Sequence, residues 1–220
     1  MSNRFTSSLF FQEKIHPVLA RLPLYDYWLL RRKSYLRDVG WFKSFRTGKN
    51  VDAQLNPIPW FTYSAIHLIN DRLPEDATVF EFGSGLGTGW WADKARKVDS
   101  VEHNSEWVKK IKPLLPDHVE ILFRELDNGY ETAAGEKGTL YDVIIIDGRN
   151  RVQCCYNSIR SLSDRGIVIF DDSNRGKYQA AIQMLKKGGF KQLPLRGFSP
   201  IDFLGCETSI FYREGNLLNL

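Results

Sequence analysis

Short apolar runs alternate with amphipathic stretches along most of this chain. Seven runs rich in Val, Ile, Phe and Tyr fit β-strands, and stretches with apolar residues three or four positions apart fit the helices between them. Strands that alternate with helices predict a mostly parallel sheet covered by helices on both faces. The expected strands are 78–82, 98–102, 118–123, 141–146, 166–170, 189–195 and 207–212, and the expected helices among them are 88–96, 105–115, 151–162 and 175–187.

Two of the strands indicate where the centre of the sheet lies. The runs VIII at 143–146 and IVIF at 167–170 are apolar without interruption, which is typical of central strands buried on both faces. No helical pattern separates 189–195 from 207–212, so the last two strands are expected to form a hairpin. The seventh strand should therefore run antiparallel to its neighbours.

The first 75 residues have a different pattern, which is helical throughout. Helices are expected at 6–20 and 24–38, and a third opens at Pro57 and runs to about Leu73. We therefore predict two parts: an N-terminal helical cap or extension at 1–75, and a domain built on the sheet at 76–220.

Length and composition agree with this division. The 220 residues are 43% hydrophobic, enough for one domain with a sizeable core. Cys154, Cys155 and Cys206 show neither zinc spacing nor a disulfide framework, so they are expected to be packing residues in a reducing compartment. The beginning of the sequence does not resemble a signal peptide, and no apolar run is long enough to span a membrane, so a cytoplasmic protein is expected.

The formal charge of +4 hides an asymmetry between the two parts. Residues 1–50 hold ten Lys or Arg against three acids, a net of +7, whereas the remainder holds twenty against twenty-three, a net of −3. Aromatic residues interleaved with these cations could bind nucleic acid, anionic lipid or an acidic substrate, or could line helices that cover a substrate mouth. We favour the cap, because the cluster Arg31-Arg32-Lys33 is short and no nucleic-acid-binding motif accompanies it. Nucleic acid is not an expected partner, and peripheral membrane contact stays open.

The segment EFGSGLGTG at 81–89 is the strongest motif in the chain, and it directly follows an expected strand. Gly83, Gly85 and Gly87 lack a β-carbon, so the backbone can turn sharply and lie close to a ligand. A dinucleotide fingerprint would need its third glycine at position 88, which is Thr88. Pyrophosphate is therefore not the ligand that the spacing favours.

An acid at the end of the second expected strand completes the pattern. Glu102 lies twenty-one positions after Glu81, and a carboxylate there can accept hydrogen bonds from both ribose hydroxyls. Each feature taken singly could be a solvated strand-end charge or a tight turn. Their combination predicts a nucleoside pocket.

Together with Val101-Glu102-His103 and YDVIIIDG at 141–148, this motif resembles a class I S-adenosylmethionine-dependent methyltransferase over roughly residues 78–213. The resemblance implies a Rossmann-like α/β fold and S-adenosylmethionine as cofactor. It further implies that Glu81 and the glycine loop hold the methionine part, Glu102 the ribose and an acid after the third strand the adenine, while His103 lies at the ligand edge by its position. The cofactor-binding residues expected are Glu81, Gly83, Ser84, Gly85, Gly87, Glu102, His103 and Asp127.

Acids and arginines follow the fourth and fifth strands. Because parallel strands end at the same edge of a sheet, Asp147, Arg151, Asp171 and Asp172 should converge there, and they are the candidate catalytic residues. The three carboxylates could hold Mg²⁺, as in catechol-type and sugar O-methyltransferases, which this region resembles. Many of those relatives carry a histidine after the Asp-Gly pair, whereas 149–151 here is Arg-Asn-Arg, so the metal site stays undetermined.

Without a metal, Asp147 or Asp171 would act as general base if burial raises its pKa. Arg151 and Arg175 would then bind an anionic group of the substrate, or would neutralise the three acids in an ion-pair network. Because methyl transfer is an in-line displacement, orientation should contribute more than acid–base chemistry.

The function predicted is methyl transfer from S-adenosylmethionine to oxygen on a small or saccharide-like hydroxylated acceptor. Two alternatives remain: an RNA methyltransferase that uses the basic N-terminal segment, and a non-catalytic membrane- or protein-association module on the same fold.

Overall fold

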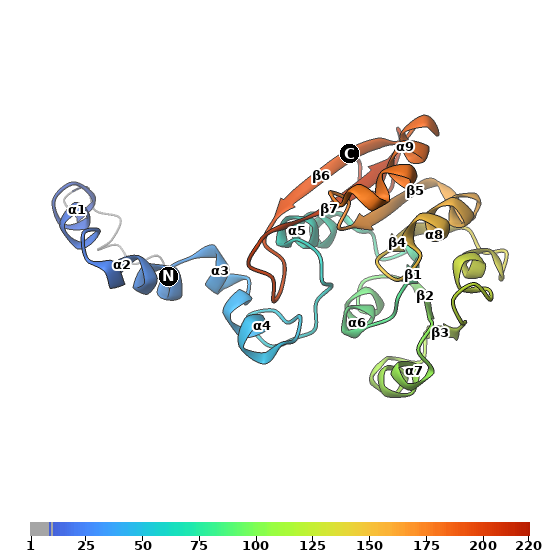
Figure 1. The fold of residues 1–220 in the computed structure, drawn as a ribbon, viewed down its shortest axis with the longest axis horizontal. Helices are drawn as coiled ribbons and strands as arrows, with labels where there is room; N and C mark the ends of the chain where they lie inside the picture. The colour runs from blue at the N-terminus through green and yellow to red at the C-terminus, as the bar shows by residue number, and fades with distance from the viewer. Residues whose placement is uncertain (1–8, 10) are drawn as a thin grey trace.

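A seven-stranded sheet with helices on both faces forms the body of the protein (Figure 1). The computed structural model describes residue 9 and residues 11–220. The strand order is β3-β2-β1-β4-β5-β7-β6; β1 to β5 pair in parallel, and β7 is antiparallel to both β5 and β6. The predicted α/β class, mostly parallel with an antiparallel last strand, is confirmed. The strands are β1 Thr78–Phe82, β2 Lys97–Glu102, β3 Val119–Phe123, β4 Tyr141–Ile146, β5 Leu162–Asp171, β6 Lys191–Gly197 and β7 Cys206–Tyr212.

Alternate residues of each central strand supply the two halves of the core. Val79 and Val143 face one side of the sheet, while Phe80 and Ile144 face the other, and all four are fully buried. The parallel register pairs Val79 with Val143 and Phe80 with Ile144. Uninterrupted apolar runs are needed in β4 and β5 because both faces of these strands are covered.

Different helices cover the two faces. Buried residues of α5 (Tyr63–Arg72), α6 (Leu86–Ala92) and α7 (Ser105–Ile111) pack in one half of the core. Those of α8 (Arg151–Ser158) and α9 (Gln179–Lys187), together with the short 3₁₀ segment η3 (Tyr130–Gly135), pack in the other. The remaining short 3₁₀ segments are η2 Lys112–Leu114, η4 Ile159–Ser161 and η5 Gly176–Tyr178.

Some element boundaries differ from those predicted. Strand β5 begins at Leu162, because Tyr141 pairs with Leu162 before a register shift. Helix α5 begins at Tyr63 rather than Pro57. Thr62 caps it, with its hydroxyl accepting a 3.4 Å hydrogen bond from the Ala65 N–H, and Thr62 is also held by the distant β6 and β7: its N–H donates to the Thr208 hydroxyl and its hydroxyl to the Leu195 carbonyl, both at 3.1 Å. Sequence periodicity carries no information about these long-range contacts.

The N-terminal part forms short helices instead of the two long ones predicted. They are η1 Phe11–Ile15 (a π-helix), α1 His16–Leu19, α2 Pro23–Arg32, α3 Tyr35–Asp38 and α4 Trp41–Thr47. The predicted helix 24–38 is interrupted at Lys33, whose φ is −143°, and Ser34 then caps α3 by accepting a 3.2 Å hydrogen bond from the Arg37 N–H. The predicted helix 6–20 lies partly outside the described residues.

Helices α1 and α2 extend away from the body (Figure 1). The chain meets the body at α3, where the centroid of the Tyr35 ring lies 6.4 Å from that of Tyr63 and 5.9 Å from that of His67, both in α5, and again at α4. The Trp41 indole N–H donates a 2.8 Å hydrogen bond to the carbonyl of Asp202 in the β6–β7 loop. Further along, Phe61, Ile66 and Ile69 belong to the same core half as Val79. The division at residue 75 stays a prediction.

Candidate functional site

A cavity of about 1010 Å³ opens at the carboxyl ends of β1, β2, β4 and β5. This is the edge at which the sequence predicted the ligand to lie. The cavity brings together all the predicted site residues except Asp127: Glu81, Gly83, Ser84, Gly85, Gly87, Glu102, His103, Asp147, Arg151, Asp171 and Asp172 line it.

The glycine loop, which follows β1 and runs into the first turn of α6, requires glycine at two positions because of close backbone contacts within the fold. Gly83 has a φ of +92°, and a β-carbon on it would lie 2.9 Å from the Gly148 Cα. A β-carbon on Gly87 would lie 2.9 Å from the Pro59 Cα. Gly85 differs, because its backbone is extended and a β-carbon there would meet open space. Since Gly85 lines the cavity, that space is part of the cavity and is open to a ligand.

Alanine substitutions at Gly83 and Gly85 should therefore have different effects, one on stability and the other on cofactor affinity. Gly83→Ala is expected to cost about 1–3 kcal/mol of stability, because of its left-handed φ and the close backbone contact. Gly85→Ala is expected to leave the melting temperature unchanged and to weaken cofactor binding. Thermal unfolding and calorimetric titration of both variants provide the measurement, and equal destabilisation by the two changes would contradict this account.

Glu81 is buried beneath the loop and holds its turn together. Its Oε2 accepts a 2.5 Å hydrogen bond from the Thr88 hydroxyl, and Thr88 Oγ1 in turn accepts one of 2.9 Å from the Gly85 N–H. Burial raises the pKa of Glu81 to about 7; the nearby Glu102 charge adds to this, while hydrogen bonds from Thr88 and Ser100 oppose it. A cation in the cavity would favour the ionised carboxylate.

Glu102 is the last residue of β2, and one of its carboxylate oxygens is held by hydrogen bonds from the protein. Its Oε1 accepts hydrogen bonds from the backbone N–H groups of His103 (2.9 Å) and Asn104 (2.8 Å). The Nδ1 atom of His103 also lies 2.9 Å from this oxygen. Within the described part of the chain no hydrogen bond reaches Oε2, so this oxygen is available to a ligand in the cavity.

A buried hydroxyl without a partner indicates that the cavity accepts a polar ligand. Ser84 is 6% exposed, and among the described residues its Oγ has no hydrogen-bond partner. A buried hydroxyl left in this state costs free energy, and a ligand that hydrogen bonds to it would recover that cost. Together with the open space at Gly85 and the free oxygen of Glu102, this hydroxyl fits the nucleoside cofactor implied by the sequence motif.

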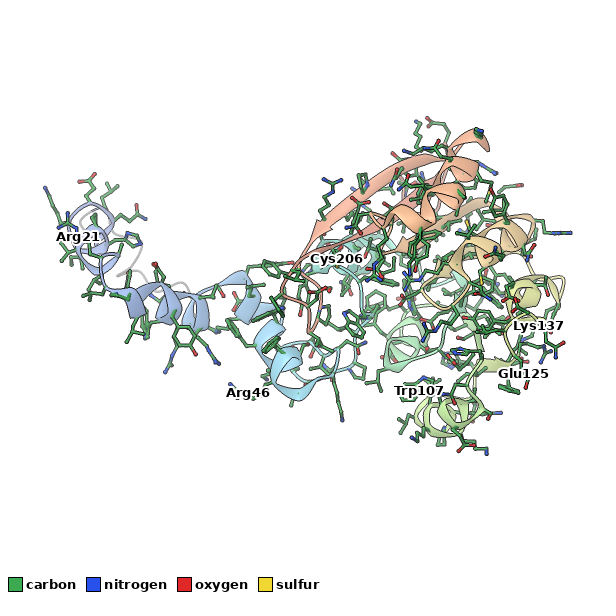
Figure 2. The ribbon with its side chains drawn as sticks, viewed as in Figure 1. Arg21, Arg46, Trp107, Glu125, Lys137 and Cys206 are labelled. Carbon is green, nitrogen blue, oxygen red and sulfur yellow. The ribbon has the colours of Figure 1, made fainter. Side chains whose placement is uncertain are left out.

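Trp107 and Tyr130 are among the aromatic residues of the cavity wall that sequence reasoning missed; Phe61 and Tyr178 are others. The Trp107 indole N–H donates a 2.8 Å hydrogen bond to the Ser84 carbonyl, which places the ring against the glycine loop. Figure 2 labels Trp107 on the α7 side of the body. Tyr130 lies fully buried below the cavity, and its Oη accepts a 3.4 Å hydrogen bond from the Arg149 N–H. A large aromatic residue in the polar helix just after Glu102 was the available signal for Trp107.

Asp127 lies outside the cavity. It is exposed, has a φ of +60°, and its N–H donates a 3.2 Å hydrogen bond to Glu131. The structure therefore does not bring it to the other candidate residues, and its contact with adenine stays a prediction.

Arg151 lies between the three acids of the rim, with its guanidinium fully committed. The five N–H bonds of an arginine match five protein acceptors. Nε donates to the Gly148 carbonyl (3.1 Å), Nη1 to the Asp171 carbonyl (2.5 Å) and Asp172 Oδ2 (3.4 Å), and Nη2 to the carbonyl (2.9 Å) and Oδ1 (2.8 Å) of Asp147. The guanidinium also lies over the Tyr178 ring, 5.3 Å from its centroid. Arg151 thus forms the ion-pair network that was one of the two sequence-based alternatives.

Two of these acids have strongly shifted pKa values. Burial, assisted by the charge of Asp171, raises the pKa of Asp147 well above its usual range, although Arg151 opposes the shift. Burial also raises the pKa of Asp171 to about 6, while Arg151 and a 2.8 Å hydrogen bond from the Thr208 hydroxyl oppose it. Carboxyls tuned in this way can accept a proton near neutral pH.

The rim does not fit a divalent cation. The guanidinium of Arg151 occupies the space between the three carboxylates, and its Nη1 lies 3.6 Å from Asp171 Oδ2. The part of the chain that the structure describes contains no group of three His, Cys, Asp or Glu side chains placed to hold a metal ion. No chemical step is therefore assigned to a metal.

Comparison with known proteins gives a likeness of fold. No protein-family model matches the sequence, and no curated protein matches it. Among solved structures, a precorrin-6y C5,15-methyltransferase from Geobacter metallireducens is 12% identical, with 69% of this chain and 87% of that chain covered and a TM-score of 0.55. An rRNA methylase from Streptococcus thermophilus is 11% identical (67% and 93% covered, TM-score 0.51). A candidate methyltransferase from Streptococcus mutans, solved in complex with SAH, is 12% identical (66% and 94% covered, TM-score 0.50).

Proposed function

We propose that this chain, whose fold is that of class I S-adenosylmethionine-dependent methyltransferases, transfers a methyl group from S-adenosylmethionine to a hydroxyl of a small or saccharide-like acceptor. One observation carries the proposal: a single cavity joins the loop of Gly83, Gly85 and Gly87 to two carboxyls with raised pKa values, Asp147 and Asp171. The loop supplies a nucleoside site, and the carboxyls supply a base beside it.

The cofactor half of the cavity offers one group for each part of the ligand. Glu81 provides the negative charge for the cationic methionine part, and Oε2 of Glu102 accepts from the ribose. The Ser84 hydroxyl, which has no hydrogen-bond partner among the described residues, and the edge of Trp107 complete this half. When bound, S-adenosylmethionine supplies an electrophilic methyl group on a sulfonium centre.

The acceptor half contains the base and the charges around it. Asp147 or Asp171 takes the proton of the acceptor hydroxyl as the oxygen–carbon bond forms and the sulfur–carbon bond breaks. Arg151 positions both carboxylates but has no N–H left for the acceptor. Any anionic group of the acceptor would therefore be bound by cations nearer the opening: Arg149, which is exposed and lines the cavity, and Arg175, which pairs with Asp172 at 2.9 Å.

Cofactor affinity should depend on pH through Glu81. Because the carboxylate must lose its proton to pair with the cationic cofactor, affinity should rise roughly tenfold from about pH 6 to about pH 8. Glu81→Gln should weaken binding and remove most of this dependence. Calorimetric titration with S-adenosylmethionine measures both effects, and radiolabelled methyl transfer to a panel of hydroxylated acceptors tests the reaction. Absence of cofactor binding at either pH would refute the proposed function.

A further inference from the structure

The N-terminal arm, defined as residues 9 and 11–38, exposes many apolar side chains; in the described part of the chain its ring contacts with the body include those of Tyr35 in α3 with Tyr63 and His67 of α5. No residue of α1, α2 or α3 is buried. Figure 1 shows the arm projecting from the body, and Figure 2 labels Arg21 far out on it. Eight large hydrophobic residues of the arm are exposed: Leu9, Val18, Leu22, Leu24, Tyr27, Trp28, Leu30 and Tyr35.

The arm combines this apolar surface with positive charge. Leu24, Tyr27 and Trp28 share one face of α2, because residues three and four apart are neighbours on a helix. Leu24 is 76% exposed and Trp28 47% exposed. Arg31 and Arg32 occupy the last turn of the same helix. A helix with leucine and aromatic residues on one side and arginine beside them has the composition of helices that lie in a membrane interface.

The root of the arm continues into the rim of the cavity. Phe45 of α4 and Phe203 of the β6–β7 loop pack edge to face, 6.3 Å between ring centroids, and both are more than half exposed. Leu204, which follows Phe203, is 83% exposed. We call Phe45, Phe203 and Leu204 the rim patch. Lys49, just beyond α4, and Asp202, just before Phe203, both line the cavity.

We propose that the arm docks on the surface of an anionic lipid membrane and that the rim patch brings the cavity opening to that surface. Charge complementarity favours this partner, since residues 1–50 carry a net +7 (ten Lys or Arg against three acids). The contact is peripheral: no helix in the described part of the chain has the length and apolar character needed to cross a bilayer.

The chemistry of the exposed residues separates a membrane from the other macromolecules that a basic segment could bind. Five of the eight exposed residues of the arm are aliphatic: Leu9, Val18, Leu22, Leu24 and Leu30. Bases of single-stranded nucleic acid stack on aromatic rings, so aliphatic side chains contribute little there. At a bilayer the same side chains enter the boundary between headgroups and acyl chains and gain hydrophobic free energy.

Docking also predicts where the acceptor comes from, and this part of the inference rests on the proposed function. A cavity whose rim meets the bilayer receives its acceptor from the membrane surface. The proposed class is a hydroxylated headgroup or a hydroxylated molecule attached to lipid, which agrees with the cations Lys49, Arg149 and Arg175 around the opening.

Vesicle sedimentation with the full chain tests the docking without cofactor or acceptor, so its result is independent of methyl transfer. The protein should bind phosphatidylcholine vesicles containing about 30% phosphatidylserine, and should bind pure phosphatidylcholine vesicles at least about tenfold more weakly. The double variant Leu24→Glu/Trp28→Glu should lose binding to the anionic vesicles by at least about tenfold. Binding should also weaken as salt is raised.

A matched pair on the body is the control. Leu114 and Leu140 are 69% and 58% exposed and lie outside the arm and the rim patch, so Leu114→Glu/Leu140→Glu should bind like the unmodified protein. Unchanged circular dichroism verifies that each variant is folded. Failure to bind anionic vesicles would overturn the proposal. Equal loss of vesicle binding in both double variants would also overturn it. So would binding to single-stranded RNA without binding to vesicles, or a dimer that forms through the arm and does not bind lipid.

Discussion

Replacing Glu102 with alanine is expected to weaken S-adenosylmethionine binding by roughly 100-fold, equivalent to about 3 kcal/mol, because hydrogen bonds to a charged carboxylate contribute about 1.5–3 kcal/mol each. The reason lies in how the carboxylate is held. Oε1 is fixed by the N–H groups of His103 and Asn104, so Oε2 meets the ribose with little loss of side-chain entropy. Calorimetric titration of the folded variant measures the effect.

Two further variants separate the ligand contact from the structural one. Glu102→Gln retains an oxygen for the two backbone N–H groups, so it should fold normally and still bind more weakly, because the charge is lost. Glu106→Ala, one helical turn further on, removes an exposed acid that pairs only with Lys109 among the described residues, and it should bind like the unmodified protein. Full affinity in both Glu102 variants would rule out the ribose contact.

Replacing Arg151 with alanine is expected to lower the free energy of unfolding by about 3–5 kcal/mol near pH 8, the range found when a buried ion pair loses one partner. Three carboxylates would be left without their cation, and the backbone carbonyls of Asp147, Gly148 and Asp171 would each lose a donor. Urea unfolding at about pH 8 and about pH 5 gives the measurement.

The sign of the pH effect follows from the raised pKa values. In the native protein Asp147 and Asp171 bind protons more tightly than in the unfolded chain, so their contribution to stability falls as pH rises through the interval up to the raised pKa values. Without Arg151 both pKa values rise further. The loss in Arg151→Ala should therefore be larger near pH 8 than near pH 5, where the carboxyls can be neutral.

Arg175→Ala is the matched control, because Arg175 pairs with Asp172 at 2.9 Å but is 54% exposed. An exposed pair contributes little to stability, so this variant should unfold almost like the parent at both pH values. If Arg151→Ala lost the same free energy at both pH values, packing against Tyr178 would be its main role and the electrostatic account would be wrong.

The order and type of the body's elements could be predicted because each depends on neighbours in the chain. The run at 143–146 is apolar at every position, and a strand buried on both faces requires that pattern. The segment 81–89 contains the glycines that its turn requires, and Glu102 ends the next strand, so the sequence alone predicts that both lie at the ligand edge. Parallel strands bring their ends together whatever their side chains do.

The features that could not be predicted are those in which the role of a side chain depends on residues distant in the sequence. Arg151 could equally have bound an acceptor or neutralised the acids, and only the geometry of five acceptors at its guanidinium decided between these roles. Trp107 is held at the cavity by a hydrogen bond to the carbonyl of Ser84, twenty-three residues earlier, whereas Asp127 lies outside the cavity. The amphipathic pattern at the N-terminus is equally compatible with helices that cover the cavity and with helices that project from the body.

Local pattern thus specified the strands, the glycine loop and the acids at the sheet edge, because backbone propensity and burial act over a few residues. The assembled fold alone selected which of those charges pair with each other, which face the cavity and which apolar side chains stay exposed. These outcomes depend on distances between segments far apart in the chain, and desolvation and Coulomb energies vary steeply with such distances.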